Sequence, residues 1–400
     1  MDRQMDKQKK KIMWAVLIIA FIQTPGAAIS PGINQISTTA FSAYSLATVQ
    51  TVLAFYHLVQ PAVALGSAFL IARGYITNRN IVIIGLCLFF LTAVLALIIN
   101  TSFWHLSILS VMLGTGIGLS ANMFTLIFDN FEPGERQRIM GYQSANINIG
   151  GIVLSIIGGL LATLRWYFVY LVLILGLPAA LLLYFTVPDY KTGANGRKAK
   201  KGKMRLHPKI YYYCVLAFAY SLTFTVCGNN LSTHISGIGD AAMAGIAVAF
   251  MMGGGAASGL FFHKLPANSS DYSISIGFVA MFTGYMLLSL FPSSFFFTFL
   301  AVFIVGLSLS VVMPRCIFMV STLVEDPSYT ATASALVVVV FTSIGSFLSP
   351  VIFTNLTVAL YGESTAARYR FVSFVVLACA LTIAALTFRS GRKPASGANA

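Results

Sequence analysis

Long apolar runs, separated by short polar stretches, recur twelve times along the chain. A helix crosses the hydrocarbon core of a bilayer with about 20 mostly apolar residues, and each run is close to that length. The runs predict spans at residues 12–30, 46–72, 80–99, 104–128, 138–163, 166–187, 210–232, 240–262, 272–291, 294–322, 329–356 and 367–388. The pattern therefore predicts an all-α integral membrane protein with twelve transmembrane helices.

One polar stretch is much longer than the others and divides the spans into two groups of six. Residues 188–209 are rich in glycine and lysine and are expected to form a cytoplasmic central loop. This loop separates a six-helix half at 12–187 from a second half at 210–388, with tails at 1–11 and 389–400. Lysines before the first run resemble the start of a signal peptide, but the run lacks a convincing cleavage site, so we expect a retained helix.

Composition agrees with this pattern and excludes a soluble enzyme. Hydrophobic residues make up 58% of the chain and charged residues only 9%, whereas soluble proteins carry about 25% charged residues. The five cysteines are odd in number, lie inside apolar runs and form no CxxC pair. We therefore expect neither a disulfide framework nor a zinc site, and no cofactor.

The positions of the basic residues predict the orientation of the chain. If the N-terminus lies in the cytoplasm and the spans alternate, 22 of the 25 lysines and arginines fall on the cytoplasmic side. The positive-inside rule then predicts a protein of the cell membrane with both termini in the cytoplasm. The formal net charge of +14 is therefore interpreted as contact with an anionic leaflet rather than with nucleic acid.

Two segments that lie 190 residues apart resemble each other. GIGLSANMFTLIF begins at Gly116 and GLSLSVVMPRCIF begins at Gly306, each in the fourth span of its half. At the same offset, the dipeptide Ser-Ala at 144–145 recurs at 334–335. Parallel six-span repeats are a known transporter architecture, with the substrate site at the repeat interface near the midplane.

A local motif makes the resemblance to a known family more specific. Residues 133–141 read PGERQRIMG and resemble the P-x-E-R-x-x-x-x-G signature of the major facilitator superfamily. The glycine-rich stretch 114–118 and the run SFLSP at 346–350 also resemble family sequences, the latter among Gram-positive members. The resemblance covers about residues 12–388. It implies the major facilitator fold, transport by rocking of two pseudo-symmetric halves, and a cavity lined by spans 1, 4, 7 and 10.

Three departures from the family patterns weigh against proton antiport. The loop LIARGYITNR at 70–79 lacks the acidic residue of the family's G-x-x-x-D-R-x-G-R-R pattern. The arginine that many proton-coupled members carry in span 4 is absent, and Ser110 sits near its place. Span 5 contains the paired glycines Gly158 and Gly159 without the proline of the antiporter signature. The motifs therefore support the architecture but not proton antiport.

Titratable groups inside the predicted spans are few. All eleven acidic residues fall in loops or at helix ends, so we expect no buried carboxylate to couple transport to protons. His57 lies near the midplane when span 2 is counted at ~1.5 Å per residue, and imidazole titrates near neutral pH. It is the candidate coupling group, with Gln60 on the same face and Pro61 able to open the local backbone. The alternative is a neutral histidine bonded between helices.

Polar side chains at mid-depth define a predicted substrate cavity. They are Gln23, His57, Gln143, Asn146, Asn122, Tyr220, Thr223, Ser308 and Arg315. Each could instead be a hydrogen bond between helices. Arg315 in particular is either a snorkelling arginine at the cytoplasmic interface or an anion contact at the inner end of the cavity.

Charged residues of the cytoplasmic loops form a predicted conformational latch. They are Asp129, Glu135, Arg136, Arg73 and Arg79. The alternative is that these residues are solvated charges with no role in the conformational change.

These features favour a secondary transporter over an enzyme. A mostly apolar, uncharged cavity suits a small amphipathic or weakly polar solute. We expect an exporter of drug-like compounds; the alternative is a facilitator or symporter for a small metabolite or organic anion. A membrane enzyme would need a cluster of acids or histidines at one interface, and a channel would conduct sustained currents. Protons are the candidate coupling ion, and we expect a monomer surrounded by membrane lipids.

Overall fold

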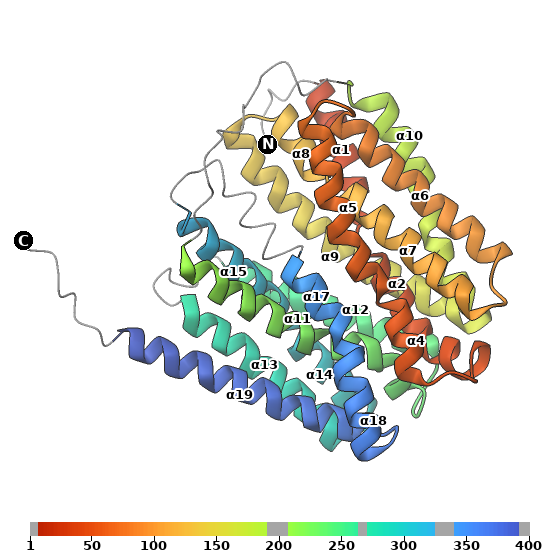
Figure 1. The fold of residues 1–400 in the computed structure, drawn as a ribbon, viewed down its shortest axis with the longest axis vertical. Coiled ribbons are helices and arrows are strands. Elements are labelled where there is room, and N and C mark those ends of the chain that lie inside the picture. The colour runs from red at the N-terminus through yellow and green to blue at the C-terminus, as the bar shows by residue number, and fades with distance from the viewer. Residues whose placement is uncertain (1–6, 190–206, 263–269, 325–339, 392–400) are drawn as a thin grey trace, which may run out of the picture. The chain divides into compact units, whose positions relative to one another are not determined.

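The computed structural model describes residues 7–189, 207–262, 270–324 and 340–391. Within these ranges the chain forms helices and no strand (Figure 1). Twelve of the described helical stretches are long and apolar enough to span a membrane, which confirms the predicted fold class. They are Lys7–Ala40, Leu46–Ile71, Asn78–Ile98, Phe103–Ser120, Ile139–Leu164, Trp166–Thr186, Pro208–Ile235, Ala241–Leu260, Asp271–Leu290, Phe295–Val320, Thr342–Tyr361 and Thr365–Phe388.

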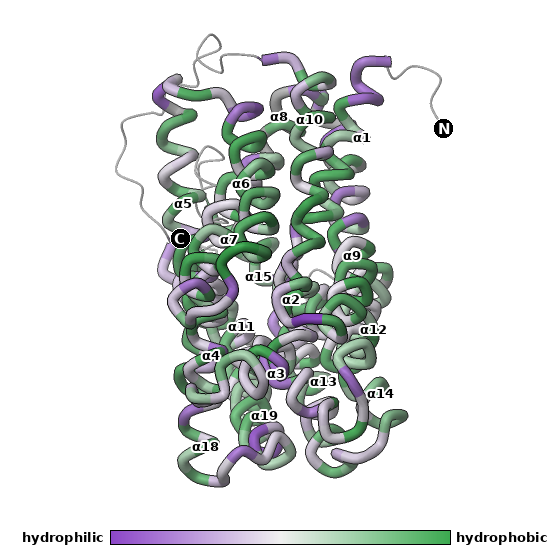
Figure 2. The backbone as a smooth tube through the Cα atoms, turned by 90° about the vertical axis from the view of Figure 1, so that its right-hand side faces the viewer, coloured by the Kyte–Doolittle hydropathy of each residue, from purple (hydrophilic) through white to green (hydrophobic). Residues whose placement is uncertain are grey.

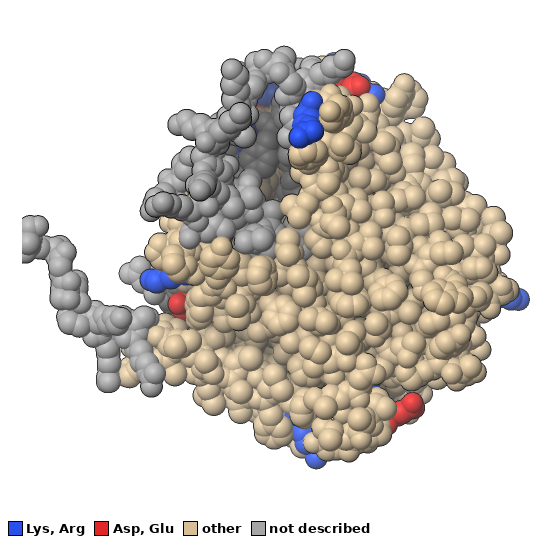
Figure 3. Space-filling view, in the orientation of Figure 1, with Lys and Arg blue, Asp and Glu red and all other residues tan. Residues whose placement is uncertain are grey.

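The hydropathy of the folded chain agrees with a multi-pass membrane protein. Helix α6 (Asn78–Ile98) is hydrophobic along most of its length (Figure 2). Few charged residues interrupt the face of the molecule shown in Figure 3. The largest departure from the predicted spans is the first one, which continues to Ala40, well past the predicted end at residue 30.

The contacts within the chain divide it into two compact units. The first comprises Met1–Gly202 and Gly228–Met252, and the second comprises Lys203–Cys227 and Gly253–Ala400. The end of the seventh span and the first half of the eighth therefore pack with the N-terminal helices. The two six-helix halves expected from the sequence repeat have different boundaries from these units and stay a prediction. Most of the expected central loop lies outside the described residues.

The first unit contains the first six spans. Its elements are α1 (Lys7–Phe21), α2 (Pro25–Ile29), η1 (Ser30–Gly32), α3 (Ile33–Gln35), η2 (Ile36–Ala40), α4 (Leu46–Leu53), α5 (Phe55–Ala72), α6, α7 (Phe103–Ser120), α8 (Met123–Asn130), α9 (Pro133–Leu164), η3 (Trp166–Leu175) and α10 (Gly176–Thr186). The buried core of this unit is almost entirely aliphatic and aromatic.

The remaining elements follow in the same order along the chain. They are α11 (Pro208–Ile235) and α12 (Ala241–Phe262), which both units share, then α13 (Ser270–Leu290), α14 (Phe295–Leu307), α15 (Leu309–Thr322), α17 (Thr342–Ser349), η7 (Pro350–Thr354), α18 (Asn355–Tyr361) and α19 (Thr365–Gly391). The predicted start of the eleventh span, at residue 329, lies outside the described part of the chain.

Several spans are interrupted in mid-course. Span 1 breaks between α1 and α2, where Pro25 occupies the first turn of the new helix. Proline fits there because the first helical N–H groups have no intrahelical partner. In span 2, by contrast, α5 continues through Pro61, and the interruption lies at Ala54, between α4 and α5. Pro61 thus does not end the helix, although it has no N–H to donate to the carbonyl one turn earlier, that of His57.

Glycines allow α9 to pack closely against the first span. A Cβ atom added at Gly150 would collide with the carbonyl oxygen of Phe21, and one added at Gly158 would collide with that of Ala28. Small residues at helix interfaces let backbones approach in this way. This contact holds α9 alongside α1 and α2 in a parallel arrangement, because both contact positions advance together along the two spans.

Candidate functional site

The interior of the described spans offers mainly neutral polar groups. Asp271 is the one acidic residue in the twelve described spans, and it is the first residue of its span. The hydroxyl of Tyr213 donates a hydrogen bond to its Oδ1 atom at 2.8 Å. Among the described residues, no group of three His, Cys, Asp or Glu side chains could hold a metal ion.

His57 lies immediately after the interruption in span 2. Its backbone N–H donates to the carbonyl of Ala54 at 3.0 Å. Its ring lies against the ring of Tyr56, with centroids 3.9 Å apart, and is partly exposed. The structure shows no side-chain hydrogen bond from this ring to a described residue, so the interhelical interpretation gains no support.

The break in span 1 places Gln23 beside span 4. Its amide nitrogen donates to the hydroxyl of Ser120 at 3.3 Å. Its carbonyl oxygen is buried and has no hydrogen-bond partner among the described residues. A buried acceptor of this kind is costly to leave unpaired. The carbonyl oxygen of Gln23 is therefore well suited to accept a hydrogen bond from a donor group of a solute.

Asn122 lies at a second interruption, between α7 and α8. Its amide nitrogen donates to the hydroxyl of Ser67 at 2.8 Å and to the carbonyl of Leu119 at 3.0 Å. These bonds connect span 4 to span 2. The structure therefore favours the interpretation of Asn122 as a contact between helices.

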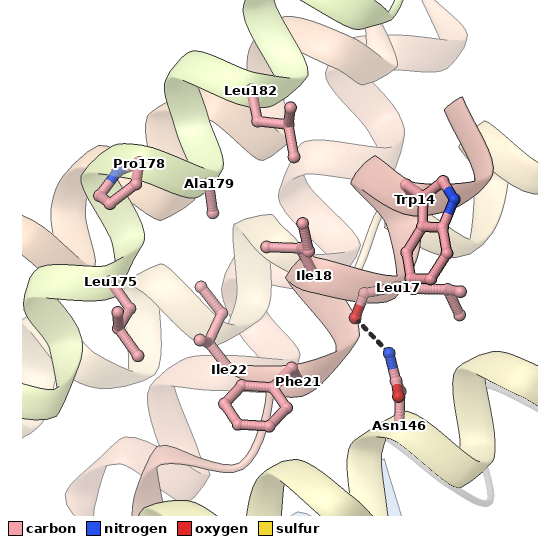
Figure 4. Close-up of a pocket in the computed structure, with 10 residues that line it drawn as sticks. All are labelled: Trp14, Leu17, Ile18, Phe21, Ile22, Asn146, Leu175, Pro178, Ala179 and Leu182. Carbon is pink, nitrogen blue, oxygen red and sulfur yellow. Dashed lines mark hydrogen bonds between the residues drawn. The ribbon is translucent and has the colours of Figure 1, made fainter. Parts of the chain in front are cut away.

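Gln143 and Asn146 lie on the face of α9 that packs against α1. The Asn146 amide nitrogen donates to the carbonyl of Leu17 at 3.0 Å (Figure 4). Gln143, one turn earlier, is 1% exposed, and neither polar atom of its side chain has a hydrogen-bond partner among the described residues. Asn146 also lines a cavity of about 510 Å³, whose other lining residues are apolar. This volume is within the range of about 300–1,000 Å³ typical of small-molecule pockets.

In the second unit, three predicted cavity residues lie together and are buried. The hydroxyls of Tyr220 and Ser308 are 3.2 Å apart and share a hydrogen bond. Thr223 donates to the carbonyls of Ala219 and Tyr220 at 2.8 and 3.1 Å. Because Tyr220, Thr223 and Ser308 satisfy one another or nearby backbone, their placement favours packing between spans 7 and 10 over contact with a solute.

The side chain of Arg315 is buried. It is 4% exposed, and its guanidinium carbon lies 5.7 Å from the centroid of the Phe318 ring. Helix α15 continues through the preceding proline, Pro314. This burial gives no support to the alternative of a snorkelling arginine, and the anion-contact interpretation stays a prediction.

Two of the predicted latch residues, Glu135 and Arg136, make contacts near the beginning of α9. The Lys9 ammonium donates to Glu135 Oε2 at 3.0 Å, and Arg136 Nε donates to the carbonyl of Phe131 at 2.7 Å. The ammonium of Lys9 and a hydrogen bond from the Glu132 backbone N–H lower the pKa of the Glu135 carboxyl. This ion pair joins the beginnings of α1 and α9.

The two latch arginines of the second loop make separate contacts. Arg79 Nη1 donates to the carbonyl of Val187 at 2.9 Å, and its guanidinium lies 5.1 Å from the centroid of the Tyr184 ring. Arg73 lies over the ring of Phe69 at 4.2 Å. The side chain of Asp129 lies outside the described part of the structure.

A polar cluster at the end of α11, within the first unit, was not predicted. Gln50 donates from its amide nitrogen to the carbonyl of Asn229 at 2.8 Å and to Asn230 Oδ1 at 3.1 Å. Both Gln50 and Asn230 are almost fully buried. In the sequence, Gln50 and the pair Asn229 and Asn230 are polar residues in separate apolar runs, and nothing there reveals that residues 180 positions apart are partners.

Two serine contacts extend this cluster. Ser30 Oγ donates to the carbonyl of Gly228 at 2.6 Å, and Ser232 Oγ donates to the carbonyl of Pro31 at 2.6 Å. The cluster thus connects α11 to the interrupted first span and to α4.

Comparisons with known proteins agree with this architecture. The sequence profile of the Major Facilitator Superfamily matches residues 12–350. The structure resembles a variant of the nucleoside transporter NupG, at 12% identity and a TM-score of 0.74, over 94% of this chain and 99% of that one. It also resembles a bacterial homolog of the human lysosomal transporter Spinster in an inward-facing, unoccupied conformation, at 16% identity and a TM-score of 0.72, over 96% and 98% of the chains.

A third similar structure is that of a D-xylose–proton symporter, at 15% identity and a TM-score of 0.66, over 94% of this chain and 96% of that one. At these identities the likeness shows the fold alone. No curated protein matches this chain in sequence.

Proposed function

Since the chain belongs to the major facilitator superfamily of transporters, we propose that it is a secondary transporter that moves a small amphipathic or weakly polar solute by alternating access. The observation that carries this proposal is the scarcity of acidic residues in the described spans, where the one acidic residue stands at a span boundary. The buried charges there are cationic, since Arg315 and Arg368 are 4% and 0% exposed. A multiply cationic solute would find no buried carboxylate in the described spans to offset its desolvation cost, which favours an uncharged or singly charged solute.

Export of drug-like compounds is the first candidate activity. It is supported by the apolar and aromatic composition of the spans, in a chain of which 13% is aromatic. We place the protein in the cell membrane, with both termini in the cytoplasm, on the distribution of its basic residues. We further propose that it acts as a monomer and without catalytic activity.

Transport of a small polar metabolite is the second candidate activity. Gln23 and Ser120 present an amide and a hydroxyl side by side. The Gln23 carbonyl oxygen has no hydrogen-bond partner among the described residues, so it can accept a hydrogen bond from a donor group of the solute. Nucleosides and sugars carry such donors, and the similar structures include transporters of both. His57 is the proposed proton site if transport is coupled, because its ring is partly exposed and makes no side-chain hydrogen bond to a described residue.

One experiment separates these activities. Cells that express the protein are loaded with a lipophilic cationic dye, and loss of the dye is followed with and without an uncoupler. Uncoupler-sensitive loss above the vector control supports proton-driven export. If well-expressing cells retain the dye, uptake of labelled nucleosides, sugars and organic anions is measured in proteoliposomes. Absence of transport in both assays would contradict the proposal.

A further inference from the structure

A groove with apolar walls lies in the first unit, between α1 and α10, with Asn146 of α9 beside it (Figure 4). Its volume is about 510 Å³. Trp14 and Ile18 line it and are 60% and 41% exposed. The groove is therefore open to its surroundings, and these are hydrocarbon at the depth of a membrane span. The amide nitrogen of Asn146, which is the one polar residue of the lining, is bonded to the carbonyl of Leu17.

Basic residues continue the same face of α1 beyond the groove. Lys7, Lys10 and Lys11 precede Trp14 by seven, four and three residues. These spacings place all four side chains on one side of the helix, in line with Ile18. The three lysines are exposed and form no ion pair with a residue that the structure describes. Lys9 lies on the other side of the helix, where it pairs with Glu135.

Aromatic side chains mark the same end of the groove. Trp14 and Leu182 lie at one end of the groove, and Leu175 lies at the other (Figure 4). Phe185, three residues beyond Leu182 in α10, is 79% exposed. Tryptophan side chains such as that of Trp14 are enriched where hydrocarbon meets the headgroup layer. The order along α1 is thus cationic, aromatic and apolar, which matches the order of phosphate, interface and acyl chain in a phospholipid.

We propose that this groove binds an acyl chain of an anionic phospholipid whose phosphate contacts Lys7, Lys10 and Lys11. Charge complementarity selects an anionic lipid over a zwitterionic one, because the three ammonium groups lack a carboxylate partner among the described residues. Apolar walls and an open side select a lipid over a water-borne solute. The binding is independent of the identity of the transported solute.

The size of the expected preference follows from the lysines. A basic residue near the membrane surface contributes about fivefold to the binding of an anionic lipid. Loss of Lys10 and Lys11 together should therefore lower the preference by up to about 25-fold at low salt. At about 0.15 M salt the screening length is about 8 Å, so only charges close to the phosphate still contribute.

Fluorescence of Trp14 gives a direct measurement. The chain has three tryptophans, and a variant with Trp104→Phe and Trp166→Phe keeps Trp14 as the one reporter. This variant is reconstituted at about 0.15 M salt in phosphatidylcholine vesicles that contain increasing fractions of either phosphatidylglycerol or phosphatidylcholine with brominated acyl chains. Bromine quenches tryptophan on contact, so the two curves give the relative affinity of the site for each lipid. We expect phosphatidylglycerol to be preferred at least fivefold.

Matched charge variants test the site. Lys7→Gln, Lys10→Gln and Lys11→Gln together should abolish the preference, whereas Lys9→Gln, on the opposite side of α1, should leave it. Equal quenching by the two lipids in the parent would overturn the proposal, as would a preference that survives loss of all three lysines or is lost equally with Lys9. Relief of quenching by a lipophilic transported dye would identify the groove as a solute site and also overturn it.

A second measurement covers the case in which the single-tryptophan variant fails to fold. Native mass spectrometry of the unsubstituted chain counts the lipids retained after mild activation. We expect one phosphatidylglycerol to be retained more strongly than phosphatidylcholine, and the difference to disappear in the variant with Lys7→Gln, Lys10→Gln and Lys11→Gln. Equal retention of both lipids would overturn the proposal.

Discussion

Substitution of Gly150 by alanine should destabilise the protein through a contact that the structure defines closely. A Cβ atom at this position would collide with the carbonyl oxygen of Phe21 and lie 2.6 Å from its carbonyl carbon and 2.8 Å from its Cα. Carbon atoms pack best at about 3.5–4.0 Å. The backbones of α1 and α9 would therefore have to separate by ~1 Å at this point.

The cost can be bounded from two opposing effects. Overpacking of a tight interface costs about 1–3 kcal/mol, and the upper part of that range applies because the clashing atoms are backbone atoms that cannot change rotamer. Alanine also raises helix propensity over glycine by up to about 1 kcal/mol. We expect Gly150→Ala to be destabilising by about 1–2 kcal/mol.

A second glycine of the same helix provides the control. A Cβ at Gly141 would meet no atom within 4 Å, so Gly141→Ala should be neutral or stabilising. Thermal unfolding in detergent can be followed with a thiol-reactive dye, because Cys214, Cys227 and Cys316 are buried and become reactive on unfolding. If Gly150→Ala melts at or above the temperature of Gly141→Ala, the close approach of α1 and α9 is not what the structure describes.

Three further predictions concern polar groups. Gln50→Leu should destabilise the protein by about 1–3 kcal/mol, since it removes two buried hydrogen bonds to α11; an unchanged melting temperature would contradict this. Because Lys9 lowers the pKa of Glu135, their contact should stabilise the fold above the unfolded pKa of about 4.3 and lose its effect as pH falls through the folded value. The melting-temperature difference between parent and Glu135→Gln should therefore be present at neutral pH and shrink in acid; a difference that grows in acid would refute the sign. Finally, His57→Ala should remove the pH dependence of transport while leaving solute exchange, and a retained pH dependence in the transport assay would exclude His57 as the proton site.

The twelve spans could be predicted because the signal for each is local. A run of apolar residues long enough to cross a bilayer can be recognised from its own sequence, without knowing which helices pack against it. The family motif at 133–141 then indicated the architecture. The interruptions were harder to predict. A proline that starts a helix, as Pro25 does, coincides with the break, whereas Pro61 lies inside a continuous helix and the break falls at Ala54.

The polar contacts could be predicted only as candidates, because the partner of a polar residue depends on which helix faces it. Tyr220 and Ser308 were expected to line a cavity, which stays a prediction, and they share a hydrogen bond across 88 residues of sequence. Gln50 and Asn230 form a buried pair for which no periodicity or motif exists. A polar residue in a span therefore indicates a position that needs a hydrogen-bond partner, but that partner can be another helix as well as a solute.

The lysines that open the chain show the same dependence on geometry at a charged site. In sequence, Lys9, Lys10 and Lys11 are one basic run whose effect is to orient the first span. A helix advances about 100° per residue, so the side chains of Lys10 and Lys11 lie within about 60° of Trp14 around the helix axis, whereas that of Lys9 lies about 140° away. Lys9 turns toward α9 and neutralises Glu135, while Lys10 and Lys11 fall in line with Trp14. Orientation of the first span requires only net positive charge at its cytoplasmic end, so each lysine can still make a separate contact. Lys10 and Lys11, which have no carboxylate partner among the described residues, lie on the face of α1 that continues the apolar groove.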